Sequence, residues 1–549
     1  MKHDLFPELN FTPVFKSLMY IRGIGTAEEL NGLLNPNLGE LKDPRMMKGM
    51  QDACARIVDA IEQAEKIGVF TDYDVDGVCS AALLHRFLIK IGSQPPVIFI
   101  PDRTTDGYGL NVRGIDELHS KGVSLLITAD CGTTAVQEIR YAKSLGMDVI
   151  VTDHHEPGDT KPDGAGMINP KQSDCPFFGE DLCGAGVVFH LMVALRALLR
   201  ERGWGNLPNL KNDLDLVAMA TVADVVSLSG INRILVKEGL QVLNSLGHTG
   251  ITALAKIAGI RREVLARDIG FILGPRINAA GRVADARKAF DLLTVEDAAQ
   301  ARLIAQELHQ LNRQRQSTEQ RVIKEAISMI EQRDQIGNIL VVAGTNWHTG
   351  VVGIVASRLA DRFAKPAIVI SITDGIGRGS GRSVAGIDLY AVLSRAKHYL
   401  RDFGGHKMAV GLTIEAEKIL PFANAIDETK AQAIHTKPEQ IEVDLKITPL
   451  DLSPKLLAEL EMLAPFGEGN PEPVFLLPAA EVVGKNRIDG NLVKFKIKHS
   501  GRIFNTMNCY LAEDLRDVPR FLDIAFTPVK RRINGHTYLY LALKALSPV

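Results

Sequence analysis

The chain has 549 residues, of which 46% are hydrophobic, 23% are charged and 6% are aromatic, and its formal net charge is −2. This composition is that of a globular protein and excludes a disordered or fibrous chain, while the length predicts about three or four domains. The first residues lack a basic segment before an apolar run, and the chain has no stretch of about 18 uninterrupted apolar residues. We therefore expect neither a signal peptide nor a membrane span, and a location in the cytoplasm.

The first third of the chain alternates between strand-like and helix-like segments. Short apolar runs occupy residues 67–71, 97–101, 125–129 and 147–152, and apolar residues with helical spacing lie between them. This pattern is typical of a parallel sheet covered by helices on both faces. In such a sheet ligands bind beyond the carboxyl ends of the strands, so the polar residues that follow each run are candidates for chemistry.

The rest of the chain predicts a helical spacer, a second α/β unit and a β-rich end. Residues 295–333 contain neither Gly nor Pro, as expected of a long exposed helix. A second α/β unit begins near residue 339, and alternating segments such as LVKFKIKH near the end favour antiparallel strands of a small barrel or sandwich. The predicted domains are an N-terminal segment packing on the catalytic domain (1–50), a catalytic α/β domain (51–294), a connecting helix (295–335), a second α/β domain (336–435) and a C-terminal β-rich domain (436–549).

Carboxylates and histidines follow three of the predicted strands. Asp72, Asp74 and Asp76 occupy alternate positions after the first run. Asp130 follows the third run, and Asp153-His154-His155 follows the fourth. A single Asp here is more often a helix cap and a single His more often structural, but carboxylates packed this closely need a cation to neutralise them. The three strand ends together therefore favour a metal site.

The donor set indicates which metals would bind. Carboxylates favour Mg²⁺ and Mn²⁺, and the imidazoles shift the preference toward Mn²⁺, with zinc or iron as alternatives. The number of donors exceeds what one ion needs. Two ions could polarise a phosphate and lower the pKa of a water without any protein nucleophile.

At this point the motifs DYDVDG, ADCG and DHH, followed by Asp224 in ATVADVVSL, resemble those of the DHH phosphoesterase family. The resemblance implies that Asp72 and Asp74 hold one metal ion, that Asp76, His154 and Asp224 hold the other, and that Asp130 bridges the two. It also implies that His155 faces the scissile phosphate, while Asp153 could orient a ligand histidine. Many relatives have His in place of Asp72, and a helix cap or a buried ion pair is the alternative for Asp224.

Glycine-rich and arginine-containing segments follow. GPRINAAGR contains Arg276, Asn278 and Arg282, and a turn with surface arginines is its alternative interpretation. Three further clusters look like the DHH-associated domain, which holds substrate, and each is expected in a turn: Trp347 with His348, Ser380 with Arg382, and Gly404-Gly405-His406. With these segments the chain resembles the RecJ family of single-stranded-DNA exonucleases over nearly its whole length. The resemblance implies that Arg276, Ser380 and Arg382 bind a terminal 5′ phosphate.

The C-terminal region has a local excess of positive charge. From residue 484 onward there are twelve Lys and Arg against five Asp and Glu. We expect an OB-like domain whose basic candidates for DNA contact are Lys494, Lys496, Lys498, Lys530, Arg531 and Arg532, with Phe504, Tyr510, Tyr538 and Tyr540 as candidates for base stacking. A solvated strand face and ordinary core aromatics are the alternatives.

The resemblance therefore implies a 5′ to 3′ exonuclease that releases mononucleotides from single-stranded DNA with two Mn²⁺ or Mg²⁺ ions. It further implies roles in DNA recombination and repair, with single-stranded-DNA-binding protein and a RecQ-type helicase as partners; a monomer is our default expectation. Two alternatives remain open. One is a DHH phosphodiesterase acting on short RNA or cyclic dinucleotides, and the other is an inactive RecJ-like replication scaffold.

Overall fold

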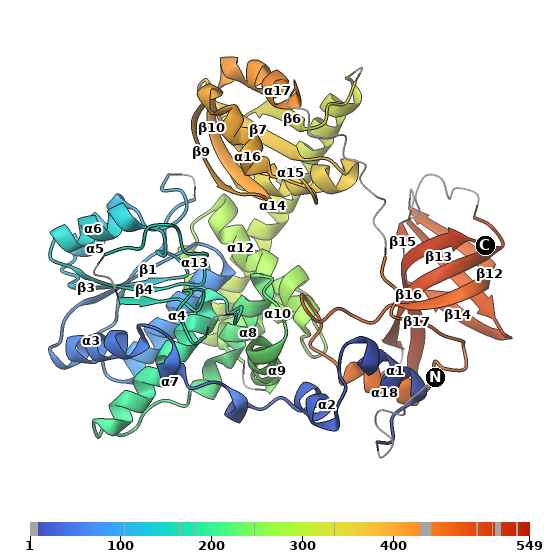
Figure 1. Cartoon of the computed structure of the whole chain (residues 1–549), viewed down its shortest axis with the longest axis horizontal. Coiled ribbons are helices and arrows are strands. Elements are labelled where there is room, and N and C mark those ends of the chain that lie inside the picture. The colour runs from blue at the N-terminus through green and yellow to red at the C-terminus, as the bar shows by residue number, and fades with distance from the viewer. Residues whose placement is uncertain are drawn as a thin grey trace. The chain divides into compact units, whose positions relative to one another are not determined.

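The computed structural model describes residues 9–103, 105–163, 166–177, 179–245, 247–333, 335–428, 441–489, 492–507, 509–510, 518–533 and 536–549 (Figure 1). The chain divides into two compact units. One unit contains residues 42–226 and 230–436, and the other contains residues 1–41, 227–229 and 437–549. Among the described residues, none of the helices combines the length and the apolar character needed to cross a bilayer.

The larger unit begins with the predicted parallel sheet, which the structure confirms. Its five strands have the order β2-β1-β3-β4-β5 and pair in parallel throughout. The strands are β1 (Ile67–Thr71), β2 (Val97–Phe99), β3 (Leu125–Ala129), β4 (Asp148–Thr152) and β5 (Gly166–Ile168). Helices α5 (Val112–Ser120) and α6 (Val136–Ser144) cover one face, and α3 (Met50–Glu62), α4 (Val75–Lys90) and α7 (Gly184–Glu201) lie on the other. The carboxyl ends of β1, β3 and β4 therefore lie side by side.

A helical region connects this sheet to the next one. It contains α8 (Leu214–Ala223), α9 (Gly230–Ser245), α10 (Thr249–Ile257), α11 (Ala266–Asp268), a π-helical turn η4 (Ile269–Leu273), α12 (Gly274–Val283) and α13 (Arg287–Thr294). The predicted spacer is confirmed as the 34-residue helix α14 (Ala298–Glu331). The GPRINAAGR segment forms α12, so the turn interpretation is wrong.

The second α/β domain contains a mixed sheet of order β6-β7-β8-β10-β9. Its strands are β6 (Leu340–Thr345), β7 (Ala367–Thr373), β8 (Ile376–Arg382), β9 (Leu400–His406) and β10 (Ala409–Glu415). Helix α15 (Thr349–Phe363) packs with α14 on one face, and α16 (Leu389–Arg395) and α17 (Ile419–Glu428) cover the other.

Two of the glycine clusters lie in strands, which corrects the expectation of turns. The Ser380 cluster lies largely in β8 and Gly404-Gly405-His406 ends β9. The reason is packing, because a side chain at Gly379 would approach Ile370 Cγ1 to 2.9 Å. Ile370 lies on β7 and pairs directly with Gly379, so a glycine there leaves room for the side chain of the neighbouring strand.

The C-terminal part of the smaller unit is a closed barrel, consistent with the predicted OB-like domain. Its strands follow the order β11-β12-β16-β17-β14-β13-β15, and an additional β12–β13 pairing closes it. They are β11 (Leu445–Lys446), β12 (Phe475–Asp489), β13 (Leu492–His499), β14 (Arg502–Thr506), β15 (Cys509–Tyr510), β16 (Phe521–Ile533) and β17 (His536–Pro548). Val493, Phe495 and Ile497 of β13 are buried, as their alternation with lysines predicted.

The N-terminal helices pack with this barrel, which corrects their predicted placement on the catalytic domain. Helices α1 (Pro13–Ile21) and α2 (Ala27–Leu34) share one hydrophobic core with α18 (Pro454–Glu461) and the barrel strands. The buried carboxylate of Glu459 accepts hydrogen bonds from the Thr12 amide (2.9 Å) and from the Thr12 hydroxyl. The smaller unit is therefore built from both ends of the chain.

We predict that Glu459→Ala lowers the stability of the smaller unit by about 2 kcal/mol, because it leaves the amide and the hydroxyl of Thr12 unpaired at a partly buried helix end. Calorimetry should show a midpoint lower by roughly 5 °C for the transition of this unit. The matched control is Glu461→Ala, which removes an exposed ion pair with Lys530 (2.8 Å) and should have little effect. Equal effects of the two substitutions would contradict the predicted contribution of the Glu459–Thr12 hydrogen bonds to stability.

A buried ionic cluster joins the C-terminal part of α4 to the N-terminal end of α8, away from the metal-binding candidates. His248 Nδ1 lies 2.6 Å from Asp215 Oδ1, and His248 Nε2 lies 3.3 Å from Asp213 Oδ1. Arg86 and Lys90 of α4 also face Asp213, at 2.9 and 3.4 Å. Burial by itself would lower the pKa of His248, but the two carboxylates outweigh it and the pKa is raised. The imidazole of His248 therefore lies between two buried carboxylates that favour its protonated form.

This cluster predicts a pH-dependent stability. Since the folded-state pKa of His248 lies above its ordinary value of 6.5, its stabilising contribution is complete below that value and is lost as the pH rises through the folded-state pKa. Chemical denaturation should show that His248→Gln lowers the free energy of unfolding more at about pH 6 than at about pH 9. An equal cost at both pH values would mean that His248 does not change charge in this range.

Candidate metal centre

The acidic residues meet where three adjacent strands end. Asp72 follows β1, Asp130 follows β3, and Asp153 and His154 follow β4, while Asp76 belongs to the first turn of α4. Asp74 caps α4, since its carboxylate accepts a hydrogen bond from the Gly77 amide (3.0 Å). Asp224 follows the last residue of α8. The ends of three strands and of two helices, α4 and α8, thus bring together residues from positions 72 to 224.

Three groups of these side chains could each hold a cation, because their ligand atoms lie within 4.8 Å of one another. The groups are Asp72 with Asp74 and Asp130, Asp76 with His154 and Asp224, and Asp130 with Asp153, His154 and His155. Asp130 also reaches the second group, since its Oδ1 lies 3.1 Å from His154 Nε2. The first two groups have the membership expected from the family resemblance, with Asp130 between them.

The electrostatics of the cluster fit a divalent cation. Burial and then Asp76 raise the pKa of Asp130 well above its ordinary value, and burial and then Asp76 raise the pKa of Asp224 to about 8. Among the described residues, Asp72 Oδ1, Asp130 Oδ1 and both ring nitrogens of His154 are buried without a hydrogen-bond partner. Such a concentration of unpaired oxygen and imidazole donors is costly unless positive charge is supplied, and it matches the ligand chemistry of Mn²⁺ or Mg²⁺.

Asp153 orients His155. Burial would raise the pKa of Asp153, but hydrogen bonds from His155 Nδ1 (2.7 Å) and the Thr133 amide (2.9 Å) lower it. Burial would lower the pKa of His155, and Asp153 raises it to about 8. The remaining nitrogen of His155, Nε2, lies 2.8 Å from the Tyr108 hydroxyl. Tyr108 was not among the predicted residues, because it lies in a loop where only a neighbouring DG pair marks a turn.

An arginine cluster lies beside the centre. Arg282 of α12 and Arg382 of β8 are partly buried, and in both cases burial and then Arg103 lower the pKa of the guanidinium, to about 10 for Arg282. Arg382 Nη1 donates to Ser380 Oγ (2.9 Å) and to the Gly381 carbonyl (2.8 Å). Arg103 thus adds positive charge beside both Arg282 and Arg382, and such a partly buried group of guanidiniums is a suitable site for an anion. Arg103 was not among the predicted residues, because it belongs to none of the motifs and lies in a loop.

Other predicted residues have structural roles. Arg276 donates to the Ile272 carbonyl (2.6 Å) and to His309 Nδ1 (3.2 Å), so its hydrogen bonds lie within the helical region. Asn278 accepts a hydrogen bond from the Val75 amide (3.1 Å) at the start of α4. Trp347 is buried in the core under α14 and donates to Glu325 (2.7 Å), which contradicts its predicted contact with substrate. His348 caps α15 by accepting from the Gly350 amide (3.0 Å).

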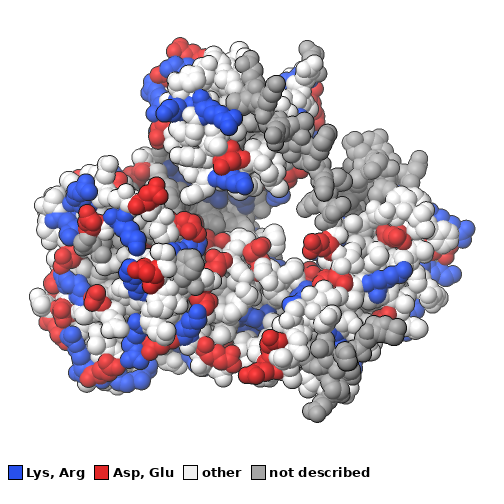
Figure 2. All heavy atoms as spheres, in the orientation of Figure 1, with Lys and Arg blue, Asp and Glu red and all other residues white. Residues whose placement is uncertain are grey.

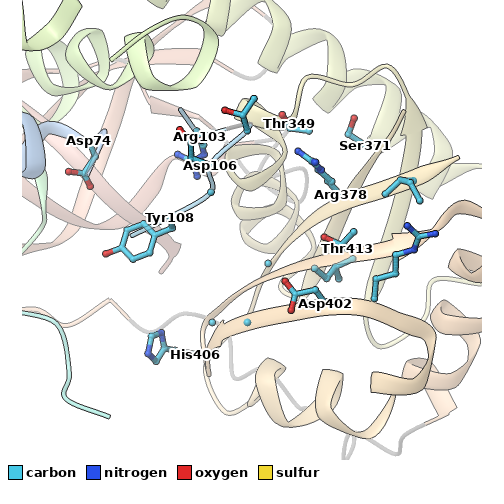
Figure 3. Close-up of a pocket in the computed structure, with 18 of the residues that line it drawn as sticks. Asp74, Arg103, Asp106, Tyr108, Thr349, Ser371, Arg378, Asp402, His406 and Thr413 are labelled. Atoms are coloured by element: carbon cyan, nitrogen blue, oxygen red, sulfur yellow. The ribbon is translucent and has the colours of Figure 1, made fainter. Parts of the chain in front are cut away.

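A cleft of about 1520 Å³ opens between the two α/β domains of the larger unit. Asp74, Asp130, His155 and Asp224 line it from the catalytic side, and Gly404, Gly405 and His406 from the other. Figure 3 shows Asp74 and Tyr108 facing Arg378, Asp402 and Thr413 across this cleft. The volume exceeds the roughly 300–1,000 Å³ of most small-molecule pockets, which suits an extended substrate better than a compact one.

Some of the basic residues of the barrel that are candidates for DNA contact are exposed to solvent. Lys496 and Lys498 are exposed on β13, and Lys494 Nζ and the Arg531 guanidinium lie 5.3 and 5.8 Å from the centre of the Tyr540 ring. Lys530 pairs with Glu461. Tyr538 is exposed, Phe504 and Tyr540 are buried, and the side chains of Tyr510 and Arg532 lie outside the described residues. Figure 2 shows basic and acidic side chains interspersed over the visible face, so any attraction for a polyanion is local.

Comparison with known proteins gives matches along most of the chain. Family models match as the DHH family N-terminal domain (residues 66–221), the DHHA1 domain (337–432) and the RecJ OB domain (443–545). Single-stranded-DNA-specific exonuclease RecJ of Bacillus subtilis is 40% identical over 90% of this chain, which spans 62% of that relative. The RecJ of Escherichia coli is 37% identical over 86% of this chain and 84% of its own length. The crystal structure of RecJ with Mn²⁺ from Thermus thermophilus has a TM-score of 0.83 and 32% identity, and the match covers 100% of this chain and 77% of that one.

Proposed function

Because this chain belongs to the RecJ family, we propose that it is a metal-dependent exonuclease that degrades single-stranded DNA from the 5′ end and releases mononucleotides. The observation that carries the proposal is that residues of the carboxylate and imidazole cluster line a large cleft. Arg103 lines the same cleft from the catalytic side. A cluster of this kind suits cleavage of a phosphodiester, and the arginine cluster suits a terminal phosphate.

The proposed ligands are those that the cluster brings together. Asp72 and Asp74 hold one divalent ion, Asp76, His154 and Asp224 hold the other, and Asp130 contacts both. When bound, Mn²⁺ or Mg²⁺ supplies a water of lowered pKa and positive charge for the phosphate oxygens. His155, which is hydrogen-bonded to Asp153, would donate a hydrogen bond to the phosphate that is cleaved, in place of its contact with Tyr108. No nucleophile from the protein is required.

The proposed direction of cleavage depends on the arginine cluster. Ser380, Arg382, Arg282 and Arg103 bind the 5′ phosphate, with the last two taking the role expected of Arg276. Charge-assisted hydrogen bonds from several guanidinium groups favour a doubly charged terminal phosphate over the singly charged phosphates within the strand. A strand would therefore enter with its 5′ end first.

The proposed path of the DNA includes the barrel. Lys494, Lys496 and Lys498 supply positive charge along one strand, and the exposed ring of Tyr538 is a candidate for stacking on a base. Single-stranded-DNA-binding protein and a RecQ-type helicase, which would supply the single strand, are the partners we propose in recombination and repair.

The test is an exonuclease assay with Mn²⁺ or Mg²⁺ on long single-stranded DNA labelled at the 5′ or the 3′ end, with Asp76→Ala as the control. Immediate release of the 5′ label as a mononucleotide, absent with the variant, is the expected result. Cleavage restricted to dinucleotides would favour the short-substrate phosphodiesterase. A wild type that binds DNA but neither cleaves it nor binds Mn²⁺ would favour the scaffold.

A further inference from the structure

The first turn of α7 contacts the candidate metal centre through its main chain. The amide of Gly184 donates to Asp76 Oδ2 (2.6 Å), and the amide of Ala185 donates to Asp76 Oδ1 (2.7 Å). Asp76 is almost completely buried. Both oxygens of this carboxylate are therefore held by one helix terminus, more than a hundred residues away in the chain.

The same turn packs tightly against Asp130. A Cβ atom at Gly184 would lie 2.6 Å from Asp130 Cβ and 3.0 Å from Asp130 Cα. Asp130 adopts a left-handed backbone conformation (φ 62°), which is uncommon for a residue with a side chain. Its amide donates to the Thr152 carbonyl at the end of β4 (2.9 Å). Asp130 is thus confined between β4 on one side and the bare backbone of Gly184 on the other.

We propose that the first turn of α7 positions the metal centre, with Gly184 holding Asp76 and Asp130 at their working separation. This inference rests on the proposed function, because it takes both carboxylates as ligands. Each carboxylate oxygen of Asp76 accepts one amide and keeps lone pairs for a cation. The two amides and the positive end of the helix dipole also favour the ionised carboxylate in a buried place. Gly184 and Ala185 are positioning residues, since they act through the ligands.

A second glycine in the same turn provides a matched control. Gly186 is buried like Gly184, but the atoms nearest to a Cβ there would be Leu182 Cδ2 at 3.4 Å, Leu182 Cβ at 3.5 Å and Cys183 Sγ at 3.8 Å, none of them from an acidic residue. Neither glycine has a positive φ that would strain an alanine. Alanine is otherwise favourable in a helix. A difference between the two alanine variants therefore reports on the contact with Asp130 and not on the helix.

The experiment is a titration of the full-length protein with Mn²⁺, followed by calorimetry or by the signal of free Mn²⁺ in electron paramagnetic resonance. Gly184→Ala should weaken Mn²⁺ binding by roughly 10- to 100-fold, the range seen when residues that orient metal ligands are replaced. Gly186→Ala should bind Mn²⁺ as the wild type does. Affinity for a 5′-phosphorylated single strand in EDTA should be unchanged in both variants, because the arginine cluster is not altered.

A second variant covers the case in which Gly184→Ala does not fold. Ala185→Pro removes one amide donor in the first helical turn, where proline is tolerated, and should weaken Mn²⁺ binding by about tenfold. If the folded variants bind Mn²⁺ as tightly as the wild type, the inference is wrong while the proposed function stands. A wild type that binds no Mn²⁺ would instead refute the proposed function, so the two failures are distinguishable.

Discussion

Replacing Asp130 by alanine is expected to reduce metal-dependent hydrolysis of single-stranded DNA by about a thousandfold or more, equivalent to about 4 kcal/mol of barrier. Asp130 belongs to the ligand group of Asp72 and Asp74, and its carboxylate also lies 3.1 Å from His154 of the group that contains Asp76 and Asp224. Its loss should therefore weaken both proposed metal positions at once. The measurement is the initial rate of mononucleotide release at saturating Mn²⁺, together with the circular dichroism of the variant.

The matched control for this prediction is Asp148→Ala. Asp148 starts β4 at the opposite end of the same sheet, where it is exposed and pairs with Arg56 (2.7 Å). An exposed pair contributes little, so this variant should keep its activity. A folded Asp130→Ala protein with more than about a tenth of the wild-type rate would refute the proposed role of Asp130.

Arg382→Ala is expected to weaken the use of 5′-phosphorylated single strands by about a hundredfold, with little change for strands that end in a 5′ hydroxyl. Truncating one partner of a buried, charged hydrogen bond costs about 2–5 kcal/mol, and a phosphate would bury Arg382, which is already partly buried beside Ser380 and Arg103. The comparison is kcat/KM for the two kinds of end, since a contact made only with the terminal phosphate should change their ratio.

Two further variants test whether a positive charge at position 382 is sufficient for the preference for 5′-phosphorylated ends. Arg382→Lys should recover only part of the preference, because an ammonium cannot donate the paired hydrogen bonds of a guanidinium. Arg362→Ala removes an exposed arginine of α15 that pairs with Glu331 (3.1 Å) and should leave the preference unchanged. If Arg382→Ala keeps the wild-type ratio between the two ends, this arginine does not bind the 5′ phosphate.

Much of the catalytic domain could be predicted from the sequence. The apolar runs at residues 67–71 and 125–129 are β1 and β3, and the carboxylates that follow them meet at one edge of the sheet. These features could be predicted because the pattern of apolar residues in a strand and the position of its end are local properties of the chain. Parallel strands also place their carboxyl ends together. The lysine alternation of β13 was readable for the same reason.

The tertiary structure decided which distant segments meet. Helices α1 and α2 complete the C-terminal core and not the catalytic one, Trp347 lies in a core, and Arg103 joins Arg282 beside the metal centre. Spacing along the chain carries no information on such contacts, because they depend on how separate elements pack. The hydrogen bonds from the amides of Gly184 and Ala185 to Asp76 also depend on such packing. An alternating run of acids predicts a metal site, but only the packing of α7 against α4 brings these amides to Asp76.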